Sequence, residues 1–273
     1  MKVRIIICLC LAVCLTVLGV SGYMVWNNYA EKQNELCEKE ENNRQTTIDS
    51  TPDETGSIAI HTEPETVDAE TAARADQQEL SQLGINSYQN NVHDFKMLRS
   101  LNSDCIGWMK IPGTIVDYPV MHTMDDPEKY YDRGFYGTYS ISGVPFLDAG
   151  CTEYSNNLII YGRDMNSGTM FAPLLNYESK SFAQEHPIIQ FETEQGLKNY
   201  SVYAVARVMR NDVFYTLKDA PNKEYFDQRV TNITQRALYT VGTQPQFGQK
   251  LITLSTCTNT SYDDRIIVIA VQK

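Results

Sequence analysis

The pattern of apolar and polar positions divides the chain into three unequal stretches. Residues 5–25 read IIICLCLAVCLTVLGVSGYMV and carry no charge, whereas residues 26–84 are mostly polar. From residue 85 to residue 273, short apolar or alternating runs recur between turn-forming residues. Alternation with a period of two is typical of strands, so residues 85–273 predict a β-rich domain of roughly 190 residues, long enough for one sizeable core.

Eight runs in this domain have strand character. Most of the connections between them are short, which predicts a mainly β fold, either a largely antiparallel barrel or a sandwich. In chain order the runs are CIGWMKI, DYPVM, GVPFLDA, NLIIYG, IIQFET, KNYSVYAVARVM, KLITLSTC and RIIVIAVQ.

Helical periodicity interrupts the strands in three places. Residues 91–101 place Val92, Phe95 and Leu98 on one helical face, with Leu101 as a further candidate. TMFAPLLNY and SFAQEHP predict one short helix and a turn after the fourth strand. Residues 221–239 predict a longer helix between the sixth and seventh strands, opened by Pro221. Its apolar positions are spaced for burial at Tyr225, Phe226, Val230, Ile233 and Leu238.

The apolar run at residues 5–25 predicts a membrane span. About 20 apolar residues in a helix cross a hydrocarbon core of about 30 Å. Two basic residues precede the run, and the first charge after it is Glu31. The positive-inside rule therefore predicts that residues 1–4 lie in the cytoplasm and the rest of the chain lies outside the cell. A cleaved signal peptide, with a weak site ending at Gly22, and acylation of Cys14 are the alternative interpretations.

Residues 26–84 predict an acidic, flexible stalk. Between residues 40 and 80 there are eleven Asp or Glu residues and two Arg residues. Such a segment has too little apolar surface to offset its ordering entropy. It also carries most of the net charge of −11, so the acidic balance describes the stalk more than the domain. No basic face is evident, which argues against nucleic-acid binding.

The cysteines suggest chemistry other than metal binding. Of the seven cysteines, only Cys105, Cys151 and Cys257 fall in the predicted domain. They form no CxxC pair and no His cluster at metal-ligand spacing, so we predict neither a metal nor another cofactor. A disulfide between Cys105 and Cys151 stays open, because the predicted location is outside the cytoplasm.

Cys257 has a setting that suggests reactivity. The apolar run LITLSTC ends at this residue, the polar turn TNTSYDD follows, and Arg265 opens the next run. A cysteine at a strand end is by default a small buried hydrophobe. A cation held across the turn, however, favours the thiolate, which is the attacking species. We therefore expect Cys257 to be a nucleophile with Arg265 as its charged partner.

Together these motifs resemble the sortases, cell-surface cysteine transpeptidases of Gram-positive bacteria, and specifically their class B. The resemblance rests on TLSTC followed by DDR, SDCIGWMKIPGTIVDYPVM, GVPFLDAG, NLIIYGRDM with GTMFAPLLNY, and the helix before the penultimate strand. It covers residues 85–273. It implies an eight-stranded sortase barrel with a leading helix and a helix between strands six and seven, active without a cofactor.

The resemblance also implies the reaction and its partners. Cys257 matches the residue that attacks the threonine carbonyl of a C-terminal sorting motif, and Arg265 matches the arginine that holds the substrate and steadies the oxyanion. An amine, from a peptidoglycan precursor or a pilin lysine, then resolves the thioacyl enzyme. The implied partners are secreted proteins with sorting signals, and the implied location is the cell membrane, with a single span and an extracellular domain.

One position departs from the family pattern. Class B sortases have a histidine after the Tyr-Gly pair, and this chain has Arg163 there. An arginine, with a pKa above about 12, does not give up a proton at neutral pH, so we predict reduced or abolished activity. Three explanations are open: an introduced substitution, a natural change in an attenuated or non-catalytic relative, or another proton donor. The alternative function is an inactive sortase-fold protein that binds sorting signals or surface-protein partners.

Three further residues are candidates for substrate contact. Ser255 and Thr256 precede Cys257 and are predicted to line the groove, although strand alternation directs one of them into the core. His122 lies just past an early strand that runs near the groove in this family, and it is the candidate replacement proton donor. Its alternative interpretation is a solvated loop histidine.

Overall fold

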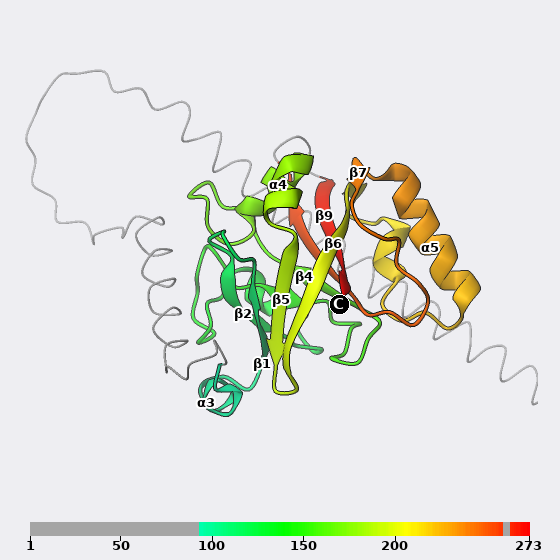
Figure 1. The fold of residues 1–273 in the computed structure, drawn as a ribbon. Coiled ribbons are helices and arrows are strands. Elements are labelled where there is room, and N and C mark those ends of the chain that lie inside the picture. Colours follow the sequence, from blue (N-terminus) through cyan, green and yellow to red (C-terminus); the bar gives the residue numbers. More distant parts are fainter. Residues whose placement is uncertain (1–92, 259–262) are drawn as a thin grey trace, which may run out of the picture. The chain divides into compact units, whose positions relative to one another are not determined.

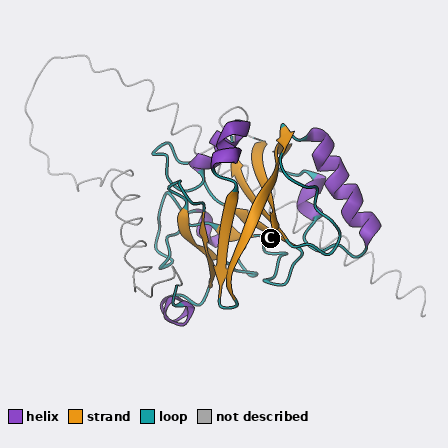
Figure 2. Cartoon of the chain, viewed as in Figure 1, coloured by secondary structure: helices purple, strands orange, loops and turns teal. Residues whose placement is uncertain are grey.

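The computed structural model describes residues 93–258 and 263–273. They form a β-barrel with short helices around it (Figures 1 and 2). The predicted N-terminus (1–4), membrane span (5–25) and stalk (26–84) lie outside the described residues. In the part of the chain that is described, no helix combines the length and apolar character needed to cross a bilayer.

Strands and helices alternate unevenly along the described chain. The strands are β1 (Cys105–Lys110), β2 (Asp117–Met121), β3 (Phe146–Leu147), β4 (Asn157–Tyr161), β5 (Ile188–Thr193), β6 (Gly196–Met209), β7 (Tyr239–Thr240), β8 (Leu251–Cys257) and β9 (Asp264–Gln272). The α-helices are α3 (Phe95–Leu101), α4 (Lys180–Glu185) and α5 (Lys223–Arg236), and the 3₁₀ helices are η1 (Lys129–Tyr131), η2 (Ala172–Glu178) and η3 (Val213–Thr216).

Eight of these strands close the barrel, which confirms the predicted architecture. Their order is β5-β1-β2-β3-β4-β8-β9-β6, and the ring closes because β6 also pairs with β5. The two-residue β7 pairs with β6 and lies outside the ring. Most neighbours are antiparallel, but β2 with β3 and β4 with β8 are parallel. The second parallel pair determines the layout of the site described below.

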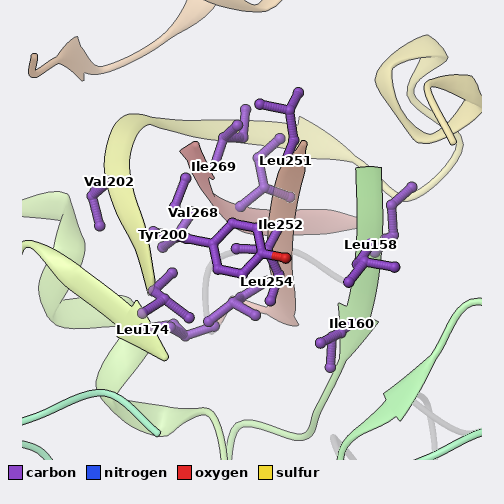
Figure 3. Close-up of a cluster of buried hydrophobic side chains, with 14 of the residues drawn as sticks. Leu158, Ile160, Leu174, Tyr200, Val202, Leu251, Ile252, Leu254, Val268 and Ile269 are labelled. Atoms are coloured by element: carbon purple, nitrogen blue, oxygen red, sulfur yellow. The ribbon is translucent and has the colours of Figure 1, made fainter. Parts of the chain in front are cut away.

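The central strands are buried on both faces. Residues 251–256 of β8 and 265–270 of β9 are all buried, which explains why these runs, apart from Arg265, hold apolar or small hydroxyl side chains and do not alternate with large polar ones. Apolar side chains from β4, β6, β8 and β9 gather in one cluster (Figure 3). On one side of the barrel, α5 lies beside β6 and β7 and buries Phe226, Val230 and Ile233 (Figure 1).

A buried polar contact fixes the register of β4 against β8. Asn157 and Thr253 are fully buried, and the Thr253 hydroxyl donates to Asn157 Oδ1 over 2.9 Å. The Asn157 amide donates to the Leu217 carbonyl over 2.8 Å, which ties the segment after η3 to the same point. A shifted register would leave these groups buried without partners, at a cost of about 1–3 kcal/mol each.

The helices differ from the predictions mainly at their ends. The 221–239 helix begins at Lys223, because Asn222 caps it by accepting the Tyr225 N–H over 2.8 Å. Pro221 therefore precedes the cap, and the prediction that it opens the helix is wrong. Leu238 lies beyond the helix end and is 47% exposed, so its predicted burial is also wrong.

Two other helical predictions need correction. Leu101, at the last position of α3, is 45% exposed, whereas Phe95 and Leu98 are buried as predicted. The segment after β4 forms two helices, η2 and α4, rather than one helix and a turn. They are separate because Ser179 has an extended backbone, with φ −83° and ψ 123°.

The third predicted strand is much shorter than residues 143–149. Only Phe146 and Leu147 pair as β3. Gly143 has a φ of +58°, and a Cβ there would lie 2.3 Å from the Tyr131 carbonyl oxygen. The chain thus turns tightly against η1 before it can extend. After Leu147, the Cys151 N–H donates to the Asp148 carbonyl over 2.8 Å, and this turn ends the strand.

Candidate active site

Cys257 and Arg265 face each other across the β8–β9 pair. The register places them directly opposite one another, as the last residue of β8 and the second of β9. Opposed residues in antiparallel strands project to the same face, with Cβ atoms about 4.5–5.5 Å apart. Arg265 is 8% exposed and Cys257 is half-buried. The thiol and the guanidinium therefore share one face, at a strand end that solvent reaches.

The parallel pairing of β4 with β8 brings Arg163 to the same place. Tyr161 pairs with Ser255, and the Gly162 N–H donates to the Ser255 carbonyl over 3.2 Å. The Thr256 hydroxyl donates to the Gly162 carbonyl over 2.8 Å. Continuing this register by two residues past Tyr161 and Ser255 sets Arg163 abreast of Cys257. Position 163, which is far from Cys257 and Arg265 in sequence, thus lies next to them at the ends of the strands.

The backbone at Arg163 is tightly held. The Phe171 ring lies against Gly162, where a Cβ would approach Phe171 Cγ to 2.6 Å, so any other residue would have to push the ring aside. The Phe171 N–H donates to the Arg163 carbonyl over 2.8 Å. The Arg163 guanidinium lies over the ring of Tyr131, with Cζ 4.6 Å from the ring centroid. This cation–π contact directs the side chain toward η1.

The comparisons with known proteins agree with this geometry. The family model for the sortase domain matches residues 109–273. This chain belongs to the sortase family. Sortase B of Listeria monocytogenes is 32% identical over 181 residues, which cover 64% of this chain and 72% of that protein. Members of the family are cysteine transpeptidases, and the relatives found here are of class B.

Solved structures show the same fold. The crystal structure of Staphylococcus aureus sortase B matches with a TM-score of 0.66 and 25% identity, over 76% of this chain and 99% of that one. The S. aureus sortase B–substrate complex matches with a TM-score of 0.61 and 24% identity, over 74% and 93% of the two chains.

In this sortase, Ser255 and Thr256 are almost completely buried, at 1% and 2% exposure. Strand alternation places Ser255 on the face of Cys257 and Thr256 on the opposite face. The Ser255 hydroxyl is hydrogen-bonded to the hydroxyl of Tyr215 over 2.8 Å, and the Thr256 hydroxyl is bonded to Gly162. Both side chains hold the site together, and direct contact of either with a substrate stays a prediction.

His122 lies apart from the thiol. It follows β2, and β3 and β4 stand between β2 and β8 in the barrel. Its side chain is half-buried, and burial lowers the pKa of the imidazole although the Ala149 backbone, Asp148 and Asp104 act to raise it. The half-buried position of His122 therefore differs from that of a solvated loop histidine, the alternative interpretation of this residue. Its service as a proton donor to the Cys257 site stays a prediction.

The other cysteines of the domain are structural. Cys105 and Cys151 are fully buried free thiols, so the open question of a disulfide between them is answered in the negative. Burial raises the pKa of Cys105 to about 11 and that of Cys151 to about 12. Among residues 93–258 and 263–273, no three His, Cys, Asp or Glu side chains are placed to share a metal ion.

Two functional neighbours were not predicted from sequence. Asp148 accepts the Tyr161 hydroxyl over 2.9 Å and pairs with Lys218 over 2.5 Å. Tyr215 on η3 packs beside Tyr161, with ring centroids 6.0 Å apart. No sequence motif near Asp148 or Tyr215 indicates these contacts. The only local signal is the Asn211-Asp212 pair after a long strand, which indicates a turn that brings the chain back to the barrel just before Tyr215.

Proposed function

We propose that this sortase is a class B cysteine transpeptidase in which Cys257 is the nucleophile and Arg163 occupies the position of the family's histidine. The observation that carries the proposal is the direct opposition of Cys257 and Arg265 on one face of β8 and β9. A fixed cation beside a thiol that solvent reaches is the arrangement that favours a reactive thiolate.

In the proposed reaction, the Cys257 thiolate attacks the carbonyl carbon of a threonine in a sorting motif. The oxyanion that forms is stabilised by the Arg265 guanidinium. The C–N bond then breaks, the departing nitrogen takes up a proton, and a thioester remains on Cys257. An incoming amine attacks this thioester, loses a proton, and releases the thiol with a new amide bond.

Arg163 affects the proton step. Because a guanidinium stays protonated at neutral pH, it gives no proton to the departing nitrogen. Loss of a general acid typically lowers the rate by 10² to 10⁴. Substrate binding is not expected to suffer. This position therefore also supports the second candidate function, a sortase-fold protein that holds sorting signals without turning them over.

The partners and location belong to the same proposal. The substrates are secreted proteins with a C-terminal sorting signal, and the acceptor amine comes from a peptidoglycan precursor or a pilin lysine. A solved S. aureus sortase B with this fold holds a substrate, which supports a peptide groove at this site. The uncharged run at residues 5–25 would anchor the chain in the cell membrane, with the barrel outside.

The test is capture of sorting peptides on Cys257. The purified protein is incubated with a panel of threonine-containing pentapeptide motifs, and adducts are located by mass spectrometry. We expect slow accumulation of a thioacyl adduct on Cys257 and none in Cys257→Ala. Arg163→His should raise the cleavage rate of a captured peptide at least tenfold.

The outcomes separate the two functions. Reversible peptide binding that Cys257→Ala leaves unchanged, with no adduct, supports the binding protein. An adduct without any gain in Arg163→His on that same peptide refutes position 163 as the missing acid.

A further inference from the structure

A buried hydroxyl pair lies behind the proposed nucleophile. Tyr215 is 3% exposed, and its hydroxyl is 2.8 Å from the Ser255 hydroxyl, which is also buried. Ser255 and Cys257 are two residues apart on β8, so their side chains project from the same face. The Tyr215 hydroxyl therefore reaches the face of β8 that carries Cys257, two residues before it.

The charges of the site act on this pair. The ionisable groups that influence the Tyr215 phenol are Arg265 of β9, Cys257 of β8 and Asp212 at the start of η3. Burial raises the pKa of the phenol well above its ordinary value, and the Ser255 hydroxyl and Arg265 only partly oppose this. Burial therefore favours the neutral form of the Tyr215 hydroxyl.

The pair is held rigidly from the η3 side. The Asp212 carboxylate caps η3 by accepting the Phe214 N–H over 2.8 Å. The same carboxylate is bound by both terminal nitrogens of Arg236, at 2.5 and 2.9 Å. After η3, the Leu217 carbonyl is fixed by Asn157. Tyr215 thus lies between two anchored points, and its hydroxyl has little freedom to leave Ser255.

We propose that the Tyr215–Ser255 hydroxyl pair is a positioning unit that stabilises the thiolate of Cys257. The proposal rests on the proposed role of Cys257 as the nucleophile. Fixed O–H dipoles near a developing negative charge can stabilise it without first reorienting, whereas water molecules would have to reorient. Tyr215 and Ser255 are both almost completely buried, so this part of the β8 face is dry, and attraction between charges such as those of Cys257 and Arg265 is stronger where water is excluded.

The test measures thiolate formation without a peptide substrate. Cys257 alkylation by iodoacetamide is followed from pH 5 to pH 9 by site-resolved mass spectrometry in the full chain. The variants are Tyr215→Phe, Ser255→Ala and the double variant. Cys105 and Cys151, buried and with raised pKa values, are the unreactive internal controls.

We expect the alkylation profile of Cys257 to move to higher pH in all three variants. Below the midpoint its rate should fall about 3- to 10-fold, the effect of losing a hydrogen-bonding environment that favours the charged form. Thermal stability should behave differently. Each single variant leaves one buried hydroxyl without a partner, whereas the double variant removes both, so the double should melt above the lower-melting single.

The double variant decides between positioning and structure. If it is as stable as the parent protein and alkylates with the parent profile, the pair is only structural and the proposal is overturned. A parent Cys257 that reacts no faster than Cys105 near neutral pH would instead overturn the proposed function itself. Recovery of stability with a persistent alkylation defect supports the proposal.

Discussion

Replacement of Gly162 by alanine tests how tightly the backbone before Arg163 is held. A Cβ at this position would lie 2.6, 2.7 and 2.9 Å from Cγ, Cδ2 and Cδ1 of the Phe171 ring. The ring must retreat by about 0.8 Å to reach ordinary van der Waals distance. Phe171 is fully buried in the main core cluster, so this movement must displace other packed side chains.

The expected cost follows from these contacts. Overpacking a core by one methyl group costs about 1–3 kcal/mol, and alanine recovers about 0.4–1 kcal/mol of it by restricting the unfolded chain. We therefore expect Gly162→Ala to lower the free energy of unfolding by about 1–2 kcal/mol and the Tm by about 2–8 °C. Peptide capture on Cys257 should slow as well, because residue 163 moves with the strand end.

The assay is urea unfolding of four proteins: the parent, Gly162→Ala, Phe171→Leu and the double variant. A smaller side chain at 171 makes room for the added methyl group. The double variant should therefore lose less stability than the sum of the two single variants. Strict additivity, or a Gly162→Ala variant within about 0.5 kcal/mol of the parent, would show that the ring does not press on Gly162.

Two further predictions concern stability. The Glu192 side chain is 3% exposed and accepts both the His93 backbone N–H at 2.9 Å and the ring Nδ1–H at 2.7 Å. His93→Leu removes the ring donor and keeps the backbone donor, so it should lower the unfolding free energy by about 1–3 kcal/mol in urea titrations. A loss below about 0.5 kcal/mol would show that the imidazole does not stabilise the buried carboxylate. Burial acts to raise the pKa of Asp212, but the Arg236 hydrogen bonds outweigh it, so the pKa is lowered. The ionised Asp212 therefore stabilises the folded protein at a pH above the unfolded-state pKa of 3.8, and this stabilisation is lost as the pH falls below that value. Arg236→Met should therefore flatten the dependence of unfolding free energy on pH between about 5 and 2, and an unchanged slope would refute the assignment.

Most of the strands could be predicted from the local pattern of apolar and turn-forming residues. Seven of the eight predicted strands appear within about two residues of their expected bounds, because apolar runs bounded by turn residues have few other ways to be buried. The opposition of Cys257 and Arg265 could also be predicted from sequence, since only a short polar segment separates the two apolar runs. The run at 143–149 failed because the tight approach of Gly143 to η1 is a tertiary contact without a local signal.

The rest of the site depended on long-range pairing. From the residues alone, nothing near Arg163 indicates that β4 runs parallel to β8, and only the resemblance to a family associated this position with Cys257. The contact of Tyr215 with Ser255 spans 40 residues and joins two residue types that are common in any core. Such contacts follow from barrel closure, which local periodicity does not encode.

The buried contact between Asn157 and Thr253 has a consequence for how such a protein can diversify. It aligns the two strands that carry position 163 and the nucleophile through a direct, fully buried contact, and among the described residues between them only Leu217 is bonded to the side-chain amide of Asn157. Segments between β4 and β8, such as α4 and α5, can therefore be exchanged or lengthened while the reactive groups keep their alignment. Grafting these segments between homologues is a route to altered recognition, whereas any change at Asn157 would disturb chemistry and selectivity together.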